Sequence, residues 1–246
     1  GNSFRNSQVV MDRAYVQYDG MNSDQYPYLT LSGGRIPNPW LSTDLVWDND
    51  LSFEGGAATY RRNLAGSNSL MDMDDRNRTL FLTVGGFFLD EVADSPNDKW
   101  LLGAQLGTRF IFDDQSMLEM GVAYYDYRNI SGRRNSLDST LLDYTAPNFM
   151  QKGNSVFEIS NSSDPANAFS RFGLAADYSL VNFTINYDIA KFSPHHLILS
   201  GDYVRNVGYD ADKIRDRLDG GVMFVNSSLF SDDPANDQIE GYQLKL

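Results

Sequence analysis

Hydrophobic and polar residues alternate along residues 100–112, which read WLLGAQLGTRFIF. One set of alternate positions, which includes Leu102 and Leu106, is mostly apolar, and the other combines glycines with Gln105 and Arg109. Because successive side chains of a β-strand point to opposite faces, the pattern predicts a strand with one apolar face and one face of small and polar groups. The pattern leaves open whether a protein core or lipid covers the apolar face.

Similar patterns recur along the chain and predict about ten strands, with no convincing amphipathic helix. The predicted strands are residues 13–18, 28–35, 51–60, 79–90, 100–112, 117–127, 172–189, 196–206, 218–226 and 240–246. Within 172–189 the apolar positions change parity near Leu180, which predicts a bulge or a tight turn there. The fold class is therefore all-β.

The connections between these strands differ in length. Residues 113–116 and 190–195 form short turns, whereas residues 128–171 form a long polar loop. Outer-membrane barrels combine short periplasmic turns with long external loops. The segment 227–238 fits this scheme less well, because it is neither short nor obviously external. We expect a single domain over residues 1–246, and part of the 128–171 loop could fold inward to narrow a lumen.

Two environments are compatible with the alternation: the core of a soluble sandwich or barrel, or a lipid bilayer. Several predicted strands approach the length of about ten residues that a tilted strand needs to cross a bilayer. Aromatic residues also occur near strand ends, where a membrane barrel has its interfacial girdles. These residues are Tyr18, Phe88, Trp100, Phe110, Phe112, Tyr124 and Tyr187. Soluble sugar-binding domains rich in β-structure are also rich in aromatics, so both environments remain open.

Composition excludes some functions. The formal net charge of −13 argues against nonspecific binding to nucleic acid, because the phosphate backbone favours basic surfaces. The chain has no cysteine, so disulfides, thiolate metal sites and cysteine nucleophiles are absent. The first residues, GNSFRN, suggest a mature form or a fragment.

The candidate catalytic and metal-binding groups are weak. His195 and His196 are adjacent, so on extended chain they face apart, and we interpret them as turn or strand-entry residues. The acidic stretch at 71–78 lacks the glycine and the later glutamate of a calcium loop. Paired carboxylates at 113–114 and 232–233 have no identifiable catalytic partners. We therefore expect no enzymatic activity, no metal site and no cofactor.

The polar faces of the predicted strands carry the most informative side chains. In a pore, such residues would line the lumen and set ion preference, whereas in a soluble fold they would form the exposed face. The candidate pore-lining residues are Gln105, Arg109, Glu119, Tyr125, Asp177 and Asp202.

Three stretches resemble a Gram-negative putative porin family, and they occur in the family's order. They are RIPNPWLSTDLVWDNDLSFEGGAATYRRN (35–63), DYTAPNFMQKGNSVFEISN (143–161) and HLILSGDYVRN (196–206). The resemblance implies an outer-membrane β-barrel that passes small solutes, with no catalysis and no cofactor. The expected architecture is an antiparallel up-and-down meander that forms part or all of such a barrel.

The function expected on this basis is passive diffusion of ions or small hydrophilic solutes through the outer membrane of a Gram-negative bacterium. The expected partners are those solutes, outer-membrane lipid and a second copy in a homo-oligomer. Two alternatives stay open: a soluble carbohydrate-binding β-protein and a barrel that anchors without conducting. The family's chains are longer, and this chain stops in mid-strand at GYQLKL. We therefore expect a fragment whose sheet is incomplete or curled, with Leu102 facing lipid and Arg109 facing inward.

Overall fold

The structure is a computed structural model of the 246-residue chain. It describes residues 12–22, 25–48, 50–64, 78–92, 97–148, 154–164, 166, 170–192, 194–218, 223–225, 228–230 and 238–246. All statements below concern these residues.

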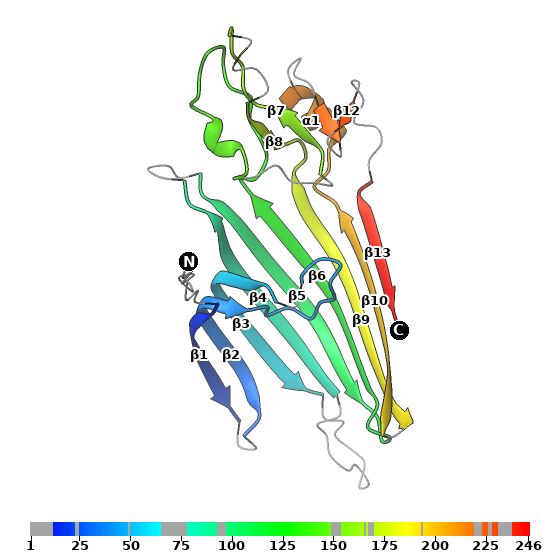
Figure 1. The fold of residues 1–246 in the computed structure, drawn as a ribbon. Coiled ribbons are helices and arrows are strands. Elements are labelled where there is room, and N and C mark those ends of the chain that lie inside the picture. The colour runs from blue at the N-terminus through cyan, green and yellow to red at the C-terminus, as the bar shows by residue number, and fades with distance from the viewer. Residues whose placement is uncertain are drawn as a thin grey trace, which may run out of the picture.

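A nine-stranded antiparallel sheet forms most of the molecule (Figure 1). Its strands are β1 (Ala14–Met21), β2 (Pro27–Pro37), β3 (Ser52–Asn63), β4 (Arg78–Asp90), β5 (Lys99–Ile111), β6 (Met117–Arg128), β9 (Tyr178–Phe192), β10 (His195–Asn206) and β13 (Glu240–Lys245). Each strand pairs with the next one of this series, so the predicted up-and-down meander is confirmed. Most of these strands are longer than the 5–6 residues usual in globular proteins.

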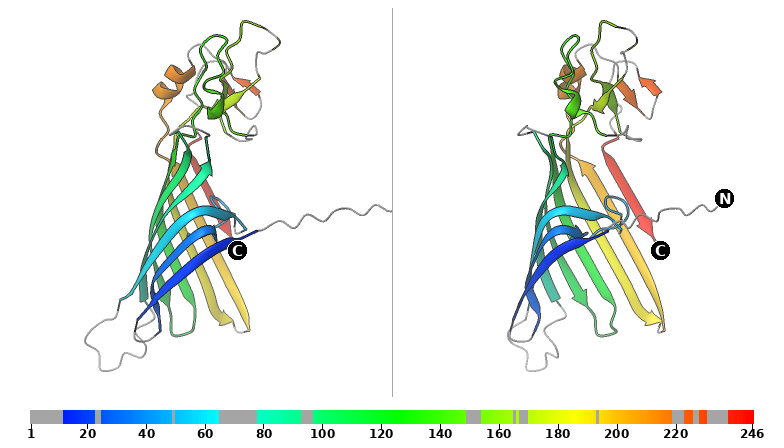
Figure 2. Two further views of the ribbon diagram at one scale, coloured as in Figure 1. Left: turned by 90° about the vertical axis from the view of Figure 1, so that its left-hand side faces the viewer. Right: turned by 60° about the vertical axis from the view of Figure 1, so that its left-hand side comes forward.

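The sheet curves into an open trough rather than a closed barrel (Figure 2). Its two edges are β1 and β13, and among the described residues no strand pairs with the outer side of either. The expectation of an incomplete or curled sheet is therefore confirmed.

The meander places connections of different kinds at its two ends. The turns after β1, β5 and β9 lie at one end, while the long connections after β6 and β10 lie at the other. The described parts of residues 129–177 and 207–230 form a cap beyond this second end (Figure 1). Of the segment 227–238, which the sequence did not place, the described residues 228–230 lie in the cap, at the same end as the described part of the 128–171 loop.

The cap contains a small sheet and a helix of its own. The sheet has the strand order β12-β11-β7-β8, formed by β12 (Ser228–Phe230), β11 (Met223–Val225), β7 (Val156–Glu158) and β8 (Phe172–Leu174). Helix α1 (Ala211–Leu218) buries Ile214 and Leu218, which are one turn apart, against Phe157, Ile159 and Ala175. A short 3₁₀ helix, Asp143–Thr145, completes the described cap.

Three details of the sequence prediction are corrected. No helix was expected, yet α1 forms in the polar stretch 211–218. The strand predicted for 218–226 is wrong in extent, because Leu218 ends the helix and, of the residues described in this range, only Met223–Val225 are extended, in the cap sheet. The parity change near Leu180 is not a bulge: the chain leaves one sheet at Leu174 and enters the other at Tyr178.

The convex face of the large sheet is apolar and exposed. Strand register places Leu82, Leu106, Val122 and Phe183 directly beside one another on β4, β5, β6 and β9. These four side chains are between 40% and 53% exposed. Leu102 lies on this same face. It pairs with Gly86 and is four residues before Leu106 on β5, and side chains alternate between the two faces along a strand.

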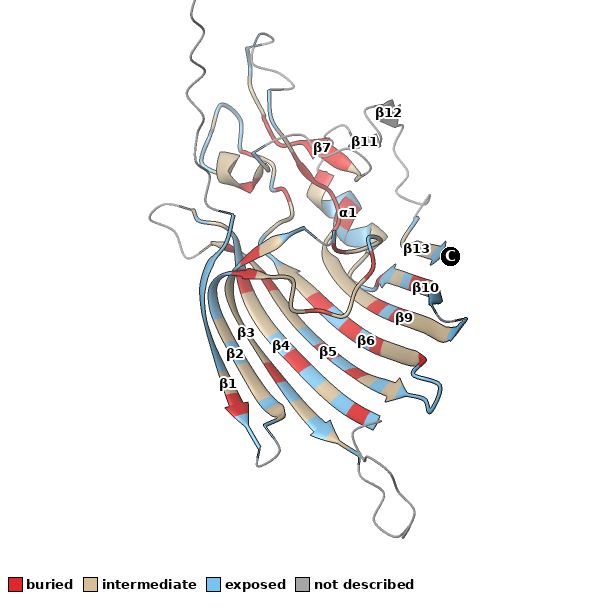
Figure 3. Ribbon diagram, turned by 60° about the horizontal axis from the view of Figure 1, so that its bottom comes forward, coloured by how far each residue is buried: buried red, intermediate tan, exposed pale blue. Residues whose placement is uncertain are grey.

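The concave face carries a matching row that is polar except at Ala123, displaced by one residue along each strand. Thr59, Thr83, Gln105, Ala123 and Asn182 are successive neighbours across β3, β4, β5, β6 and β9. All five are buried, and Figure 3 shows buried residues alternating with exposed ones along these strands. The concave face also carries the buried apolar side chains Phe53, Phe87, Leu101 and Tyr125, so the sheet buries a mixed face and exposes an apolar one.

Candidate functional site: the concave face

A segment of the β2–β3 connection covers the polar face of the sheet. We name residues 38–48 the crossing segment, because they run across the concave side of the trough (Figures 1 and 2). Gln105 on β5 holds its beginning: the Gln105 amide nitrogen donates to the carbonyl of Leu41 at 2.7 Å, and its amide oxygen accepts from the Leu41 N–H at 2.8 Å. The side-chain amide thereby pairs with the backbone in both directions, as a neighbouring strand would.

Farther along, the crossing segment reaches the opposite side of the sheet. The Thr43 hydroxyl donates to the Asp202 carboxylate on β10 at 2.6 Å. Asp44 forms an ion pair with Lys245 on β13. The segment therefore spans the concave face from β5 to the edge strand and is fixed to it at three points.

An aromatic cluster anchors the crossing segment to the middle of the sheet. Trp40 packs edge-on against Phe87 and Tyr125, with ring centroids 6.1 and 5.3 Å apart. Trp47 packs edge-on against Phe53 and Tyr125, at 5.1 and 5.2 Å. All five rings are buried. Burial of such large apolar surfaces stabilises the segment far more than its few polar contacts do.

Local sequence explains why the chain turns inward here. Pro37 ends β2, and the Asn38 side chain accepts a hydrogen bond from the Trp40 N–H at 3.0 Å while donating to the Ser42 hydroxyl at 2.8 Å. Asn and Pro are the residues that favour such turns. Gly103 on β5 makes room for Trp40, because a Cβ at this position would lie 2.7 Å from the indole ring. The turn and the glycine together seat Trp40 on the sheet.

The structure brings three of the predicted pore-lining residues together under the crossing segment. Gln105 and Asp202 bind the segment by hydrogen bonds, and Tyr125 is covered by both tryptophans. Asp202 has no ion pair among the described residues. Its carboxylate instead accepts hydrogen bonds from the side chains of Thr43, Asn182 and Thr184, which offset the penalty of burying a charged group.

Two other predicted residues lie on the open part of the concave face. Arg109 and Glu119, direct neighbours on β5 and β6, form an ion pair at 2.6 Å. The Arg109 side chain is about half exposed. This pair lies on the side of the crossing segment that faces the short β5–β6 turn.

Asp177 is the exception, because it does not lie on the large sheet. It precedes β9 in the cap, where it accepts hydrogen bonds from the Ser131 hydroxyl and, at 2.9 Å, from the Arg217 guanidinium on α1. The sequence-based placement of Asp177 on an inner strand face is corrected by the break between β8 and β9.

A cavity of about 320 Å³ lies beside the crossing segment, between it and β6, β9 and β10. Its lining combines the apolar residues Met117 and Ile198 with polar residues that include Thr43, Asp44, Asn186, Ser200 and Lys245. This surface can hold water and small polar solutes. No group of three or more histidine, aspartate or glutamate side chains suited to a metal ion occurs among the described residues.

The two histidines begin β10, as strand-entry residues. The His196 imidazole contacts the Asp188 carboxylate at 2.7 Å. The acidic stretch at 71–77 lies outside the described residues.

The crossing segment itself was missed by the sequence analysis. Its residues were noted only as part of a stretch that resembles the porin family. The long 128–171 loop was expected to form the constriction instead. The described residues of that loop lie in the cap instead. The available signal was two tryptophans, Trp40 and Trp47, inside a polar connection that follows a Pro-Asn-Pro turn.

Comparison with known families identifies the chain. The sequence profile of a family described as "Putative porin" matches residues 1–246, which is the whole chain. The chain belongs to this family. No curated protein and no solved structure matches it. No helix in the described part of the chain is long and apolar enough to cross a membrane.

Proposed function

We propose that the trough is the wall of an outer-membrane channel for passive diffusion of ions or small hydrophilic solutes, and that the crossing segment narrows it. The observation that carries this proposal is the inverted polarity of the sheet. Leu82, Leu106 and Val122 form an exposed apolar row on the convex face, while Thr83 and Gln105 belong to a buried polar row on the concave face. A soluble β-protein has the reverse arrangement, and a membrane barrel has this one.

Aromatic pairs at both ends of the convex face support the same proposal. Phe88 and Trp100 are in contact near the cap, with ring centroids 3.8 Å apart. Phe112 and Tyr187 are 6.1 Å apart at the opposite end, near the short turns. Girdles of this kind mark the two interfaces of a bilayer. In this orientation the cap faces the exterior and the short turns face the periplasm.

The proposal also requires that the two open edges of the sheet be covered in the membrane. Unpaired backbone groups in lipid cost several kcal/mol each. We therefore expect further strands to cover β1 and β13 in the membrane. A homo-oligomer would be one source of such strands.

The experiment that tests the proposal is fractionation of the protein expressed in a Gram-negative host, followed by recording in planar bilayers. We expect the protein in the outer-membrane fraction, heat-modifiable migration in detergent gels and discrete conductance steps. A soluble, monodisperse periplasmic product without conductance would overturn the proposal and favour a soluble binding protein.

A further inference from the structure

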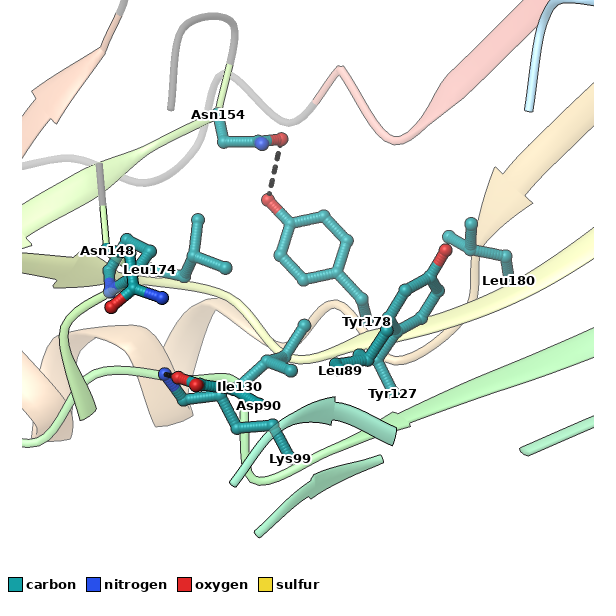
Figure 4. Close-up of a pocket in the computed structure, with 11 residues that line it drawn as sticks. Leu89, Asp90, Lys99, Tyr127, Ile130, Asn148, Asn154, Leu174, Tyr178 and Leu180 are labelled. Carbon is teal, nitrogen blue, oxygen red and sulfur yellow. Dashed lines mark hydrogen bonds and ion pairs between the residues drawn. The ribbon is translucent and has the colours of Figure 1, made fainter. Parts of the chain in front are cut away.

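A second cavity, of about 420 Å³, lies where the large sheet meets the cap (Figure 4). This volume falls in the range of sites that bind small organic molecules. Its lining combines apolar and hydrogen-bonding side chains, among them Tyr127, Tyr178, Asn148, Asn154, Leu174 and Leu180. Neither the channel proposal nor the family match assigns a role to it.

Two tyrosines form one wall of this cavity. Tyr127 on β6 and Tyr178 on β9 are directly paired in the sheet register, so their rings project from the same face side by side. Leu174 and Leu180 line the same cavity (Figure 4). Flat aromatic and aliphatic surfaces of this kind bind the C–H faces of ring-shaped solutes, because both partners lose apolar contact with water.

Hydrogen-bonding groups lie next to this apolar wall. The Tyr178 hydroxyl donates to the side-chain oxygen of Asn154 at 3.0 Å, which fixes the direction of both groups. The Tyr127 hydroxyl makes no hydrogen bond with the described residues, although its ring is largely covered. The Asn148 amide also belongs to the lining. The cavity therefore offers hydroxyl and amide partners around an apolar surface.

The charges in the cavity wall compensate one another. The lining contains two charged residues, Lys99 and Asp90. Their side chains form an ion pair at 3.0 Å. The Lys99 ammonium also donates to the Ala146 carbonyl at 3.2 Å, and the residue is only 6% exposed. Because neither charge is left unpaired, the cavity has no preference for an ionic ligand.

Taken together, these features match the chemistry of an uncharged carbohydrate, which has an apolar C–H face and a rim of hydroxyl groups. We propose that the cavity is a binding site for a neutral monosaccharide or disaccharide. Tyr127 also stacks on Trp47 of the crossing segment, with ring centroids 6.3 Å apart and planes 25° apart. The site is thus continuous with the constriction. Its position on a solute's path rests on the proposed channel, but the binding itself does not.

The test is isothermal titration of the detergent-solubilised protein with glucose, maltose and cellobiose as neutral probes. Glucuronate and glucosamine serve as charged counterparts. We expect neutral probes to bind at millimolar concentration and the charged sugars to bind more weakly. Tyr178→Phe removes one hydroxyl and should weaken binding about fivefold, while Tyr178→Ala should abolish it.

The matched control is Tyr187→Phe, which removes a tyrosine hydroxyl from the convex face of the same strand. It should leave sugar affinity unchanged, and heat-modifiable migration should show that every variant is folded. The proposal is overturned if no neutral sugar binds to the wild type, if charged sugars bind equally well, or if Tyr178→Ala binds like the wild type. A protein that binds sugar without conducting ions would refute the channel but not this site.

Discussion

The Thr43 hydroxyl donates a 2.6 Å hydrogen bond to the Asp202 carboxylate, although the two residues are 159 positions apart in the chain. One residue lies in the crossing segment and the other on β10, and both are buried. This bond joins a connection between early strands to the far side of the trough. It makes the crossing segment a bridge over the concave face instead of a loop attached at its two ends.

The substitution Thr43→Val keeps the shape of this side chain and removes the hydroxyl. The buried Asp202 carboxylate then keeps only two side-chain donors, Asn182 and Thr184. Because it loses one hydrogen bond, we expect the folded protein to be less stable by about 1–3 kcal/mol. A loosened crossing segment should also raise single-channel conductance. Urea unfolding and planar-bilayer recordings measure the two effects. The control, Thr108→Val, alters a threonine on the convex face of β5, and an equal rise in conductance there would contradict the assignment.

The substitution Gly103→Ala tests the seat of Trp40. The added Cβ would lie 2.7 Å from the indole ring, so Trp40 must move. Overpacking of this kind typically destabilises by about 1–3 kcal/mol, and we expect a larger, noisier conductance. Gly33→Ala on the convex face is the matched control, because the nearest atom to its added Cβ is 4.0 Å away. Unchanged conductance in Gly103→Ala would show that the segment does not constrict the pore.

The substitution Leu106→Arg tests the lipid-facing role of the convex face. Arginine near the bilayer midplane of a membrane barrel costs about 2–4 kcal/mol, and we expect a loss of this size when folding into lipid vesicles is measured. Ser32→Arg, on the concave face of β2, should cost much less. If both variants fold equally well, the convex face is not in contact with lipid.

Ion selectivity should depend on the Arg109–Glu119 pair. The net charge of −13 predicts a mild preference for cations. Three of the candidate pore-lining residues carry carboxylates. Asp202 is buried under Thr43 and Asp177 is paired in the cap, so Glu119 should contribute most to ion selectivity.

Reversal potentials in a salt gradient can measure this dependence. Glu119→Gln leaves Arg109 unpaired and should shift selectivity toward anions, and Arg109→Gln should shift it toward cations. Asp177→Asn serves as the control. An equal shift in all three variants would place the determinant of selectivity elsewhere.

In the cap, hydrogen bonds from the Ser163 backbone N–H and hydroxyl hold the pKa of Asp138 below its ordinary value of 3.8. A lowered pKa means that the folded loop favours the charged carboxylate. This contribution is present above the ordinary pKa and is lost as the pH falls through the lowered one. We expect Ser163→Ala to move the pKa of Asp138 part of the way back toward 3.8, because the backbone N–H remains. An NMR titration of the carboxyl carbon would measure the change, and an unmoved pKa would contradict the assigned cause.

The sequence by itself determined the strands and their two faces. The alternation in 100–112 predicted that Leu102 and Arg109 lie on opposite faces of one strand, and the structure places Leu102 on the convex face and Arg109 on the concave face. This success has a simple cause. The two-residue period of a strand is a local property, so it can be read from neighbouring residues without knowing what they contact.

Only the tertiary structure decided what covers the concave face. Gln105 binds Leu41 across 64 residues and Asp202 binds Thr43 across 159, and neither pair shares a local pattern. Helix α1 likewise depends on burial of Ile214 and Leu218 in the cap, because an isolated eight-residue helix is marginal in water. Such contacts depend on strand register and sheet curvature, which bring distant segments together only once the whole sheet has formed.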